Sequence, residues 1–300
     1  MNFWIVTPSR NQLAWLKRCV ASVRDQASGT ASRPIAVHHH VQDARSTDGT
    51  REWLEQYART RRAGPAGAYT FSFDSANDDG MYDALNRGWT RAPEDVDVFA
   101  HLNCDEQYLP GGLAVVQRFF ETHARTEVVM ADMIVVDRNG DYICHRRSLK
   151  PRRLLSRLCC VGMTATTFHR AAVVQEKKVL FDPSWRNIGD MVWYNALLRA
   201  GVRHGVCNRL VALFVDTGEN LNLTAEAVSE RKRYAREYLW GLGRLPRLVS
   251  KVYSLGRCLK EIGRERPKDY AFFWDSPDQR TVRAIANPTP LWHRRGPAAR

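Results

Sequence analysis

Two adjacent carboxylates, Asp105 and Glu106, are the residues whose type and spacing suggest chemistry most directly. They follow an apolar run at residues 98–102 that is typical of a short buried strand, and a turn at residues 108–112 comes next. Open α/β sheets bind ligands at the carboxyl ends of their strands. Adjacent hard oxygen ligands at that edge suit Mg²⁺ or Mn²⁺ carrying a phosphate-containing substrate. A solvated acidic turn is the alternative if the pair stands alone.

Other acids follow other expected strands. Asp43 comes after a strand expected at residues 34–41. Asp78–Asp79 come after a strand expected at residues 69–73, and Asp190 lies in a later loop that opens a helix. Carboxylates gathered at one edge repel each other unless a cation or polar ligand joins them. Their convergence therefore predicts a metal ion and a polar substrate.

The elements that must position these acids alternate along the first part of the chain. A strand at residues 3–7 precedes a helix that begins near Leu13, and the second strand precedes a helix that begins near Thr50. This alternation predicts an α/β fold with a parallel, Rossmann-like sheet. Beyond residue 110 the expected elements are helices at 113–120 and from 190, and strands at 128–136, 142–144 and 210–215.

Several short motifs occur in an order that is typical of one family. They are residues 5–11, 42–43, 46–50, 78–88, 102–106 and 189–190. Through these motifs the sequence resembles the family 2 glycosyltransferases, over about residues 3–218. The long run DDGMYDALNRG at residues 78–88 is the most specific of them. The resemblance implies a GT-A fold, with a mostly parallel sheet flanked by helices, and sugar transfer from a nucleotide-sugar donor, for which the family suggests a UDP-sugar.

The resemblance also implies roles for individual residues. Asp105 and Glu106 occupy the motif that holds Mn²⁺ or Mg²⁺, and Asp190 matches the general base of inverting members. A divalent cation neutralises the departing diphosphate, and one carboxylate that accepts the acceptor's proton gives inversion. The residues implied to bind nucleotide or donor are Thr7, Pro8, Arg10, Asp43, Asp78, Asp79, Gly80, Asn103 and Asp105.

Some positions depart from the family pattern or allow two interpretations. Glu106 stands where the family usually has aspartate, and Ala76 replaces a frequent glutamate, which bears on sugar specificity more than on reaction class. Trp193, three residues after Asp190, is either a sugar contact or a core residue. Asp48 is either a functional acid or the cap of the helix that follows it. Residues 38–40, three histidines, alternate sides on a strand, which disfavours a shared metal.

The C-terminal part of the chain differs in character. The net charge is +13, and the basic excess concentrates at residues 146–153 and from Arg231 onward. We therefore predict a GT-A domain at residues 1–222 and a basic helical extension with a tail at 223–300. Pro246 is expected to kink or divide the helical region. The basic helices are either a solvated face or an interfacial helix that contacts anionic lipid, which would suit a lipid-linked acceptor.

Composition bears on the class of protein and its location. Seven cysteines at irregular spacing favour a reducing compartment, and Cys159 and Cys160 are too close for an unstrained bridge. With no signal peptide or membrane span expected, we predict a cytoplasmic enzyme, peripheral at the inner face of the membrane, acting on a saccharide or lipid-linked acceptor. The alternatives are a nucleic-acid-binding protein, although strand-end acids would repel phosphate, and a degenerate nucleotide-binding module.

Overall fold

The computed structural model describes residues 1–27, 34–62, 68–158, 162–218, 224–239 and 245–292. The strands are β1 Asn2–Ser9, β2 Ala36–Asp43, β3 Tyr69–Ser75, β4 Val98–His101, β5 Glu106–Tyr108, β6 Val128–Asp137, β7 Tyr142–Arg146, β8 Thr167–Arg170, β9 His204–Asp216, β10 Asp269–Phe273 and β11 Arg280–Ala284. The helices are α1 Leu13–Arg24, α2 Thr50–Arg62, α3 Met81–Thr90, α4 Gly112–Thr122, α5 Arg153–Leu158, α6 Ala171–Gln175, α7 Gly189–Arg199, α8 Ala225–Tyr238 and α9 Leu245–Leu259, with a 3₁₀ turn η1 Thr164–Thr166.

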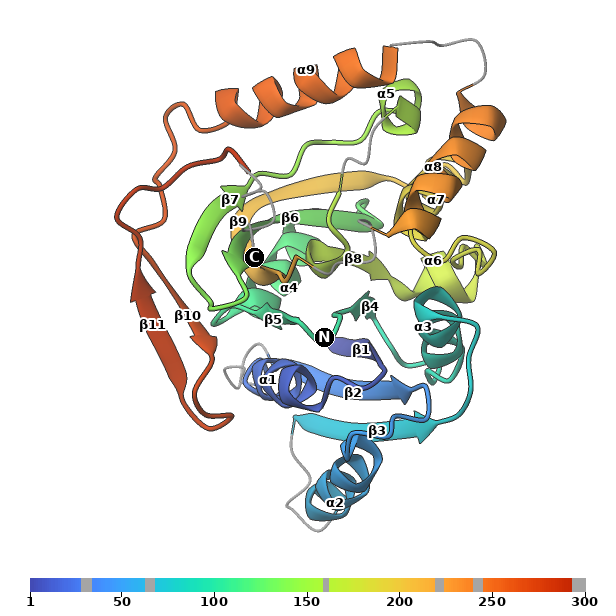
Figure 1. The fold of residues 1–300 in the computed structure, drawn as a ribbon, viewed down its shortest axis with the longest axis vertical. Coiled ribbons are helices and arrows are strands. Elements are labelled where there is room, and N and C mark those ends of the chain that lie inside the picture. Colours follow the sequence, from blue (N-terminus) through green and yellow to red (C-terminus); the bar gives the residue numbers. More distant parts are fainter. Residues whose placement is uncertain (28–33, 63–67, 159–161, 219–223, 240–244, 293–300) are drawn as a thin grey trace.

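A large curled sheet organises the described part of the chain (Figure 1). Its strand order is β3-β2-β1-β4-β8-β6-β9-β5, and β7 pairs with β6. The first four strands in this order are parallel, and β9 is parallel to β6. β8, β5 and β7 run antiparallel to their neighbours. The expected α/β sheet flanked by helices is confirmed, and parallel pairing dominates its N-terminal half while the second half is mixed.

The first strand shows why the parallel strands of this half consist mainly of apolar residues. Phe3 and Ile5 of β1 pack in the core cluster that includes Cys19 and Val23 of α1. The side chains that alternate with them pack in a second cluster on the opposite face. Both faces of the sheet are thus buried, as in other parallel sheets covered by helices. The alternation of strands and helices expected from the sequence is confirmed here.

A close helix-to-sheet contact requires glycine in α3. A Cβ atom on Gly88 would lie 2.5 Å from Cγ1 of Val6 in β1. Only glycine lets the last turn of α3 approach β1 this closely. Helix-to-sheet packing therefore explains the glycine at position 88, the last residue of the run DDGMYDALNRG.

The C-terminal residues contain a hairpin that sequence reasoning missed. β10 and β11 pair antiparallel, and Tyr270 and Phe272 of β10 pack on Ile134 and Leu213 of the main sheet. The sequence predicted a basic helical extension with a tail at residues 223–300, and the structure forms this hairpin from residues of the tail. Alternate buried residues in β10 have the period of a strand, and its contacts with the sheet stabilise it. Residues 293–300, at the end of the expected tail, lie outside the described residues, as do Cys159 and Cys160.

The helices α8 and α9 occupy the expected positions in this region. α9 begins at Leu245, so Pro246 lies in its first turn, where a missing N–H costs no intrahelical bond. The helical region is accordingly divided before Pro246. Among the described residues, no helix combines the length and apolar character needed to cross a bilayer. The boundary between a domain at 1–222 and an extension stays a prediction.

Candidate active site

A large cavity of about 1260 Å³ lies where β1 and β4 end. Its wall is built from segments far apart in the sequence: the loops after β1 and β4, the start of α3, and the loop that enters α7. Most of the residues singled out in the sequence line it, namely Pro8, Arg10, Asp78, Gly80, Asn103, Asp105, Glu106 and Asp190. The structure therefore brings together acids that the sequence predicted to converge on one edge of the sheet.

The adjacent carboxylates differ in burial. Glu106 is the first residue of β5 and only 1% exposed, and the Asn103 N–H donates to its Oε2 at 2.8 Å. Asp105 is partly exposed in the cavity wall. Burial raises the pKa of both carboxyl groups, and the neighbouring Asp105 raises the pKa of Glu106 further. Two carboxylates that are costly to ionise side by side favour the approach of a cation.

The oxygen atoms around this pair suit a hard divalent cation that arrives together with a phosphate group. Asn103 Oδ1 is buried without a hydrogen-bond partner, which leaves an acceptor beside the pair. Within the described residues, no group of three or more metal-ligating side chains occurs. Mg²⁺ and Mn²⁺ are commonly held by one or two carboxylates together with substrate phosphates and water. The residues that would hold the ion are Asp105 and Glu106.

The loop before α3 is shaped by glycine and aspartate. Gly80 has a φ of +110°, a backbone conformation that residues other than glycine rarely adopt. Its N–H donates to Asp78 Oδ1 at 3.0 Å, and burial raises the pKa of Asp78. Asp79 is exposed and does not line the cavity, and its N–H donates to Asp83 at 3.0 Å. Asp79 was expected to contact the donor, but its side chain does not line the cavity.

Asp190 is placed by contacts that converge on the start of α7. Its N–H donates to the Tyr82 hydroxyl at 3.1 Å, and the Met191 N–H donates to its Oδ1 at 2.7 Å. A Cβ atom on Gly189 would lie 2.6 Å from the Tyr82 ring, so glycine is needed for this approach. Asp190 is thus a half-buried carboxylate in the cavity wall, suited to accept a proton.

Glu230 of α8 holds the loop that leads to Asp190, and sequence reasoning did not find it. Its Oε1 accepts from the Arg186 N–H at 2.7 Å, and its Oε2 accepts from the N–H groups of Asn187 and Ile188 at 2.9 and 3.0 Å. Three consecutive backbone donors therefore converge on one carboxylate. This contact depends on a residue more than forty positions later in the chain, and no local pattern indicates it.

Two of the expected nucleotide contacts have buried side chains. Thr7 is fully buried, and its hydroxyl is 2.9 Å from Nε2 of His39. Asp43 is also fully buried, and it accepts hydrogen bonds from Ser75 Oγ at 2.7 Å and from the Ser46 N–H at 3.0 Å. Neither side chain lines the cavity. The structure gives both side chains partners inside the fold instead.

The tryptophans that line the cavity do not include the one expected from the sequence. Trp193 is 1% exposed and stacks on Phe181 with ring centroids 4.8 Å apart, so the sugar-contact interpretation is wrong and the core interpretation holds. Trp15 and Trp292 line the cavity instead. Arg146 lies over the ring of Trp292, 5.2 Å from its centroid. Trp15 and Trp292 are the candidates for stacking on a base or sugar.

Basic side chains complete the wall of the cavity. Among the residues that the structure describes, five arginines line it, namely Arg10, Arg138, Arg146, Arg186 and Arg231. Guanidinium groups are well suited to phosphate oxygens. The sequence offered a signal for Arg146 and Arg231 in its basic stretches, but the tertiary structure brings them to the acids. The arrangement suits a ligand that carries a diphosphate and a polar group.

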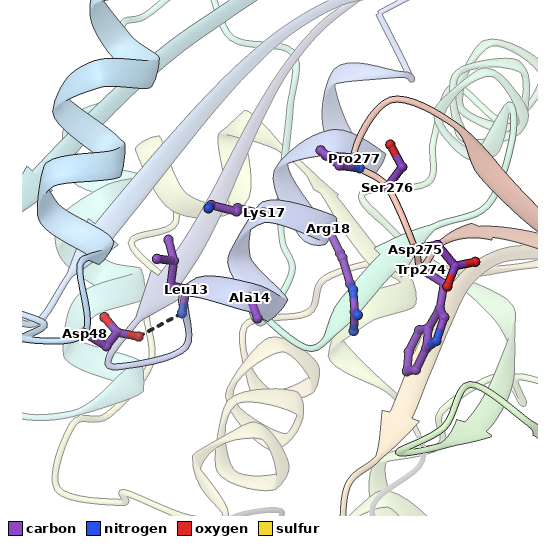
Figure 2. A pocket seen from close by; sticks show the side chains of 9 residues that line it. All are labelled: Leu13, Ala14, Lys17, Arg18, Asp48, Trp274, Asp275, Ser276 and Pro277. Carbon is purple, nitrogen blue, oxygen red and sulfur yellow. Dashed lines mark hydrogen bonds between the residues drawn. The ribbon is translucent and has the colours of Figure 1, made fainter.

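A second, smaller hollow of about 490 Å³ lies between α1 and residues 274–277 (Figure 2). Arg18 lies over the ring of Trp274, 4.2 Å from its centroid. Asp48 accepts from the Thr50 N–H at 3.2 Å and from the Thr50 hydroxyl at 2.6 Å, at the start of α2. These two bonds support the interpretation of Asp48 as the cap of the helix that follows it. Asp48 also accepts from the Leu13 N–H at 2.9 Å, at the start of α1 (Figure 2). The hollow contains none of the residues expected to bind nucleotide or metal.

The fold and the cavity define a class, the glycosyltransferases of GT-A fold, with acids and arginines at the carboxyl edge of the sheet. Within that class the chain belongs to Glycosyl transferase family 2, whose model matches residues 4–180. That match covers the strands and loops that form most of the cavity, so the chain carries a glycosyltransferase domain. The comparison with curated proteins finds no match.

Solved structures with the same fold support the assignment of architecture. S. aureus TarS 1-349 in complex with UDP-GlcNAc has a TM-score of 0.60 and 16% identity, over 87% of this chain and 69% of that one. The mannosyltransferase PcManGT from Pyrobaculum calidifontis, in complex with GDP-Man and Mn²⁺, has a TM-score of 0.52 and 13% identity, over 79% of this chain and 61% of that one. In another TarS 1-349 structure the alignment spans 60% of that chain. At such identities the likeness shows the fold.

Proposed function

We propose that this protein transfers a sugar from a nucleotide-sugar donor to the hydroxyl of an acceptor, with inversion at the anomeric carbon. One observation carries the proposal: a single cavity is lined by the Asp105–Glu106 pair, by Asp78 and Gly80, and by Asp190. The two sugar-nucleotide complexes among the fold neighbours add support, one with UDP-GlcNAc and one with GDP-Man and Mn²⁺. We propose a UDP-sugar as donor.

The residues of the cavity have distinct parts in this proposal. Asp190 accepts the proton of the acceptor hydroxyl while that oxygen forms a bond to the anomeric carbon. The bond between the anomeric carbon and the diphosphate breaks, and the nucleoside diphosphate leaves with the electron pair. Arg10 and the other arginines of the wall face the negative charge of the leaving group. One carboxylate acting as base, without a second one as nucleophile, corresponds to inversion.

Asp105 and Glu106 would hold Mn²⁺ or Mg²⁺ in this proposal. When bound, such an ion neutralises the departing diphosphate as a Lewis acid. The observations that support it are the hard oxygen ligands, the raised pKa values of both groups and the unpartnered Oδ1 of Asn103. A phosphate group in the cavity would supply the remaining ligands.

The proposed acceptor is a saccharide or a lipid-linked saccharide in polysaccharide or glycolipid assembly. We propose a cytoplasmic location. Its support is that the described cysteines Cys19, Cys104, Cys144, Cys207 and Cys258 are thiols without disulfide partners. The extension from residue 223 is proposed as a unit added to the transferase domain, to which Glu230 contributes the loop contact described above.

A thermal-shift screen with UDP, GDP, dTDP and CDP, each with and without Mn²⁺, tests the donor site. A ligand that binds only the native state raises the melting temperature by mass action, so one nucleotide should stabilise the protein in a Mn²⁺-dependent way. The absence of any shift, together with tight, salt-sensitive binding to RNA or DNA, would replace the proposal with a nucleic-acid-binding function.

Replacing the proposed base tests the mechanism separately. Asp190→Asn should keep the nucleotide-induced shift and lose transfer, because the amide cannot accept the proton. Asp95→Asn is the control, since Asp95 is an exposed acid in the loop before β4. Unchanged turnover in Asp190→Asn would show that another group is the base.

A further inference from the structure

One face of α9 and the turn after it exposes large apolar side chains to solvent. Six of the nine exposed large apolar residues among the described positions lie here, although this segment is a small part of the chain. They recur every three or four residues and so share one side of the helix. We call them the apolar stripe: Leu245 (40% exposed), Leu248 (60%), Val252 (57%), Leu255 (59%), Leu259 (56%) and Ile262 (77%).

The side of α9 that adjoins the stripe is fixed to the protein. Val249 is buried in the main core, and a Cβ atom on Gly256 would lie 3.5 Å from Leu149. Lys260 Nζ donates to the Ser148 carbonyl at 2.7 Å. The helix thus has a packed face, and the apolar stripe is what remains outward.

A buried ionic network anchors the end of the same helix. Glu261 accepts from Arg147 Nε at 2.6 Å and is 2.8 Å from Nε2 of His145. Arg147 also donates to Asp132 at 3.1 Å. Because removing one partner of such a network is costly, this end of α9 is held in place. Figure 1 shows α9 running along the edge of the molecule, beside α5.

The surface around the stripe is strongly positive. From Leu245 to Lys268 the chain has seven lysines and arginines and two glutamates, and one of the glutamates is the buried Glu261. Lys251, Arg266 and Lys268 are exposed. Apolar and basic side chains on one outward helix are the combination by which amphipathic helices lie in the interface of anionic membranes. No described helix is suited to cross a bilayer, so contact would be with one leaflet.

We propose that α9 docks on the surface of an anionic lipid bilayer. The apolar stripe enters the boundary between headgroups and acyl chains, and lysines such as Lys251 contact lipid phosphates. A second copy of the chain is the other candidate for covering the stripe. Charge favours the bilayer, because pairing two such helices would bring basic surfaces together without exposed acids on α9 to balance them. The proposal is independent of the transfer reaction.

Vesicle flotation with the full chain tests this proposal. The probes are vesicles of phosphatidylcholine alone and of phosphatidylcholine mixed with phosphatidylglycerol in equal parts. The wild-type protein should float with the anionic vesicles, and added salt should weaken this binding. The triple variant Leu248→Gln, Leu255→Gln and Leu259→Gln should bind at least about tenfold more weakly than the wild type. Lys251→Gln should weaken binding about fivefold.

Matched controls separate docking from folding and from donor binding. Val282→Gln replaces another exposed apolar residue, 66% exposed on β11, and should float like the wild type. The triple variant should keep the wild-type melting temperature, because its three leucines are exposed. Its response to nucleotide and Mn²⁺ should match that of the wild type, whether or not a response occurs.

Two outcomes would overturn the proposal. The first is vesicle binding that is left unchanged either by the triple substitution or by the absence of phosphatidylglycerol. The second is a wild-type dimer, measured by light scattering after size-exclusion chromatography, that the triple variant converts to a monomer. The second outcome would assign the apolar stripe to a second copy of the chain.

Discussion

The loop that leads to Asp190 should lose its order when Glu230 is replaced. The Glu230 carboxylate accepts from three consecutive backbone N–H groups, of Arg186, Asn187 and Ile188, at 2.7 to 3.0 Å. Glu230→Ala removes all three bonds. Glu230→Gln keeps one accepting oxygen and replaces the other with an amide that cannot accept.

The magnitude follows from the exposure of these bonds. A net contribution of about 1 kcal/mol is typical of a hydrogen bond in water, and the contact is partly exposed, so we expect the three bonds to stabilise the closed loop by about 2 kcal/mol. The opening equilibrium of the loop should rise about 30-fold in Glu230→Ala and about fivefold in Glu230→Gln. Turnover should fall in the same order, because Asp190 follows directly after this loop.

Hydrogen exchange measured by mass spectrometry on peptides covering residues 184–192 provides the assay. The amides of Arg186, Asn187 and Ile188 should exchange faster in both variants. Glu226→Ala is the matched control, since Glu226 is an exposed acid on the same helix, and should exchange at the wild-type rate.

Wild-type exchange in Glu230→Ala would refute this reasoning. In that case the loop would owe its order to packing, and the structure offers a candidate. Trp185 and Ile188 pack in one cluster with Tyr234, which also lies on α8. Tyr234→Ala would remove that packing, together with the hydrogen bonds of the Tyr234 hydroxyl to Asn195 Nδ2 and to the Arg157 carbonyl.

Two further substitutions test the acids of the cavity and of the α9 anchor. Glu106→Gln replaces a buried carboxyl group that is costly to ionise, so the melting temperature without ligand should stay equal or rise while Mn²⁺-dependent nucleotide stabilisation is lost. A lower melting temperature with an intact nucleotide response would contradict the metal assignment. Burial acts to raise the pKa of Glu261, but hydrogen bonds from Arg147 and His145 lower it below the ordinary value of 4.5. Its stabilisation is therefore present above pH 4.5 and is lost as the pH falls through the lowered pKa. Glu261→Gln should cost about 3 kcal/mol in urea unfolding at neutral pH, and the difference from the wild type should shrink in acid; an equal difference at both pH values would argue against an ionic role.

The sequence alone determined the alternation of strands and helices in the first half of the fold. It also determined which loops carry acids, because apolar runs such as that of β1 and the turns after them are local patterns. The family resemblance followed from the same loops, and the match at residues 4–180 bears it out. The basic, apolar spacing of α9 was also visible, since it repeats every three or four residues.

Only the tertiary structure decided which of these residues share a cavity. Thr7 and Asp43 have the expected positions at strand ends, but their side chains turn to partners inside the fold, and Trp193 belongs to the core. Glu230 holds the loop that leads to Asp190, and Trp292 lines the cavity, although both lie far along the chain from the strand-end acids. No local pattern predicts such contacts, because they depend on how the sheet curls and on which elements pack against its edge.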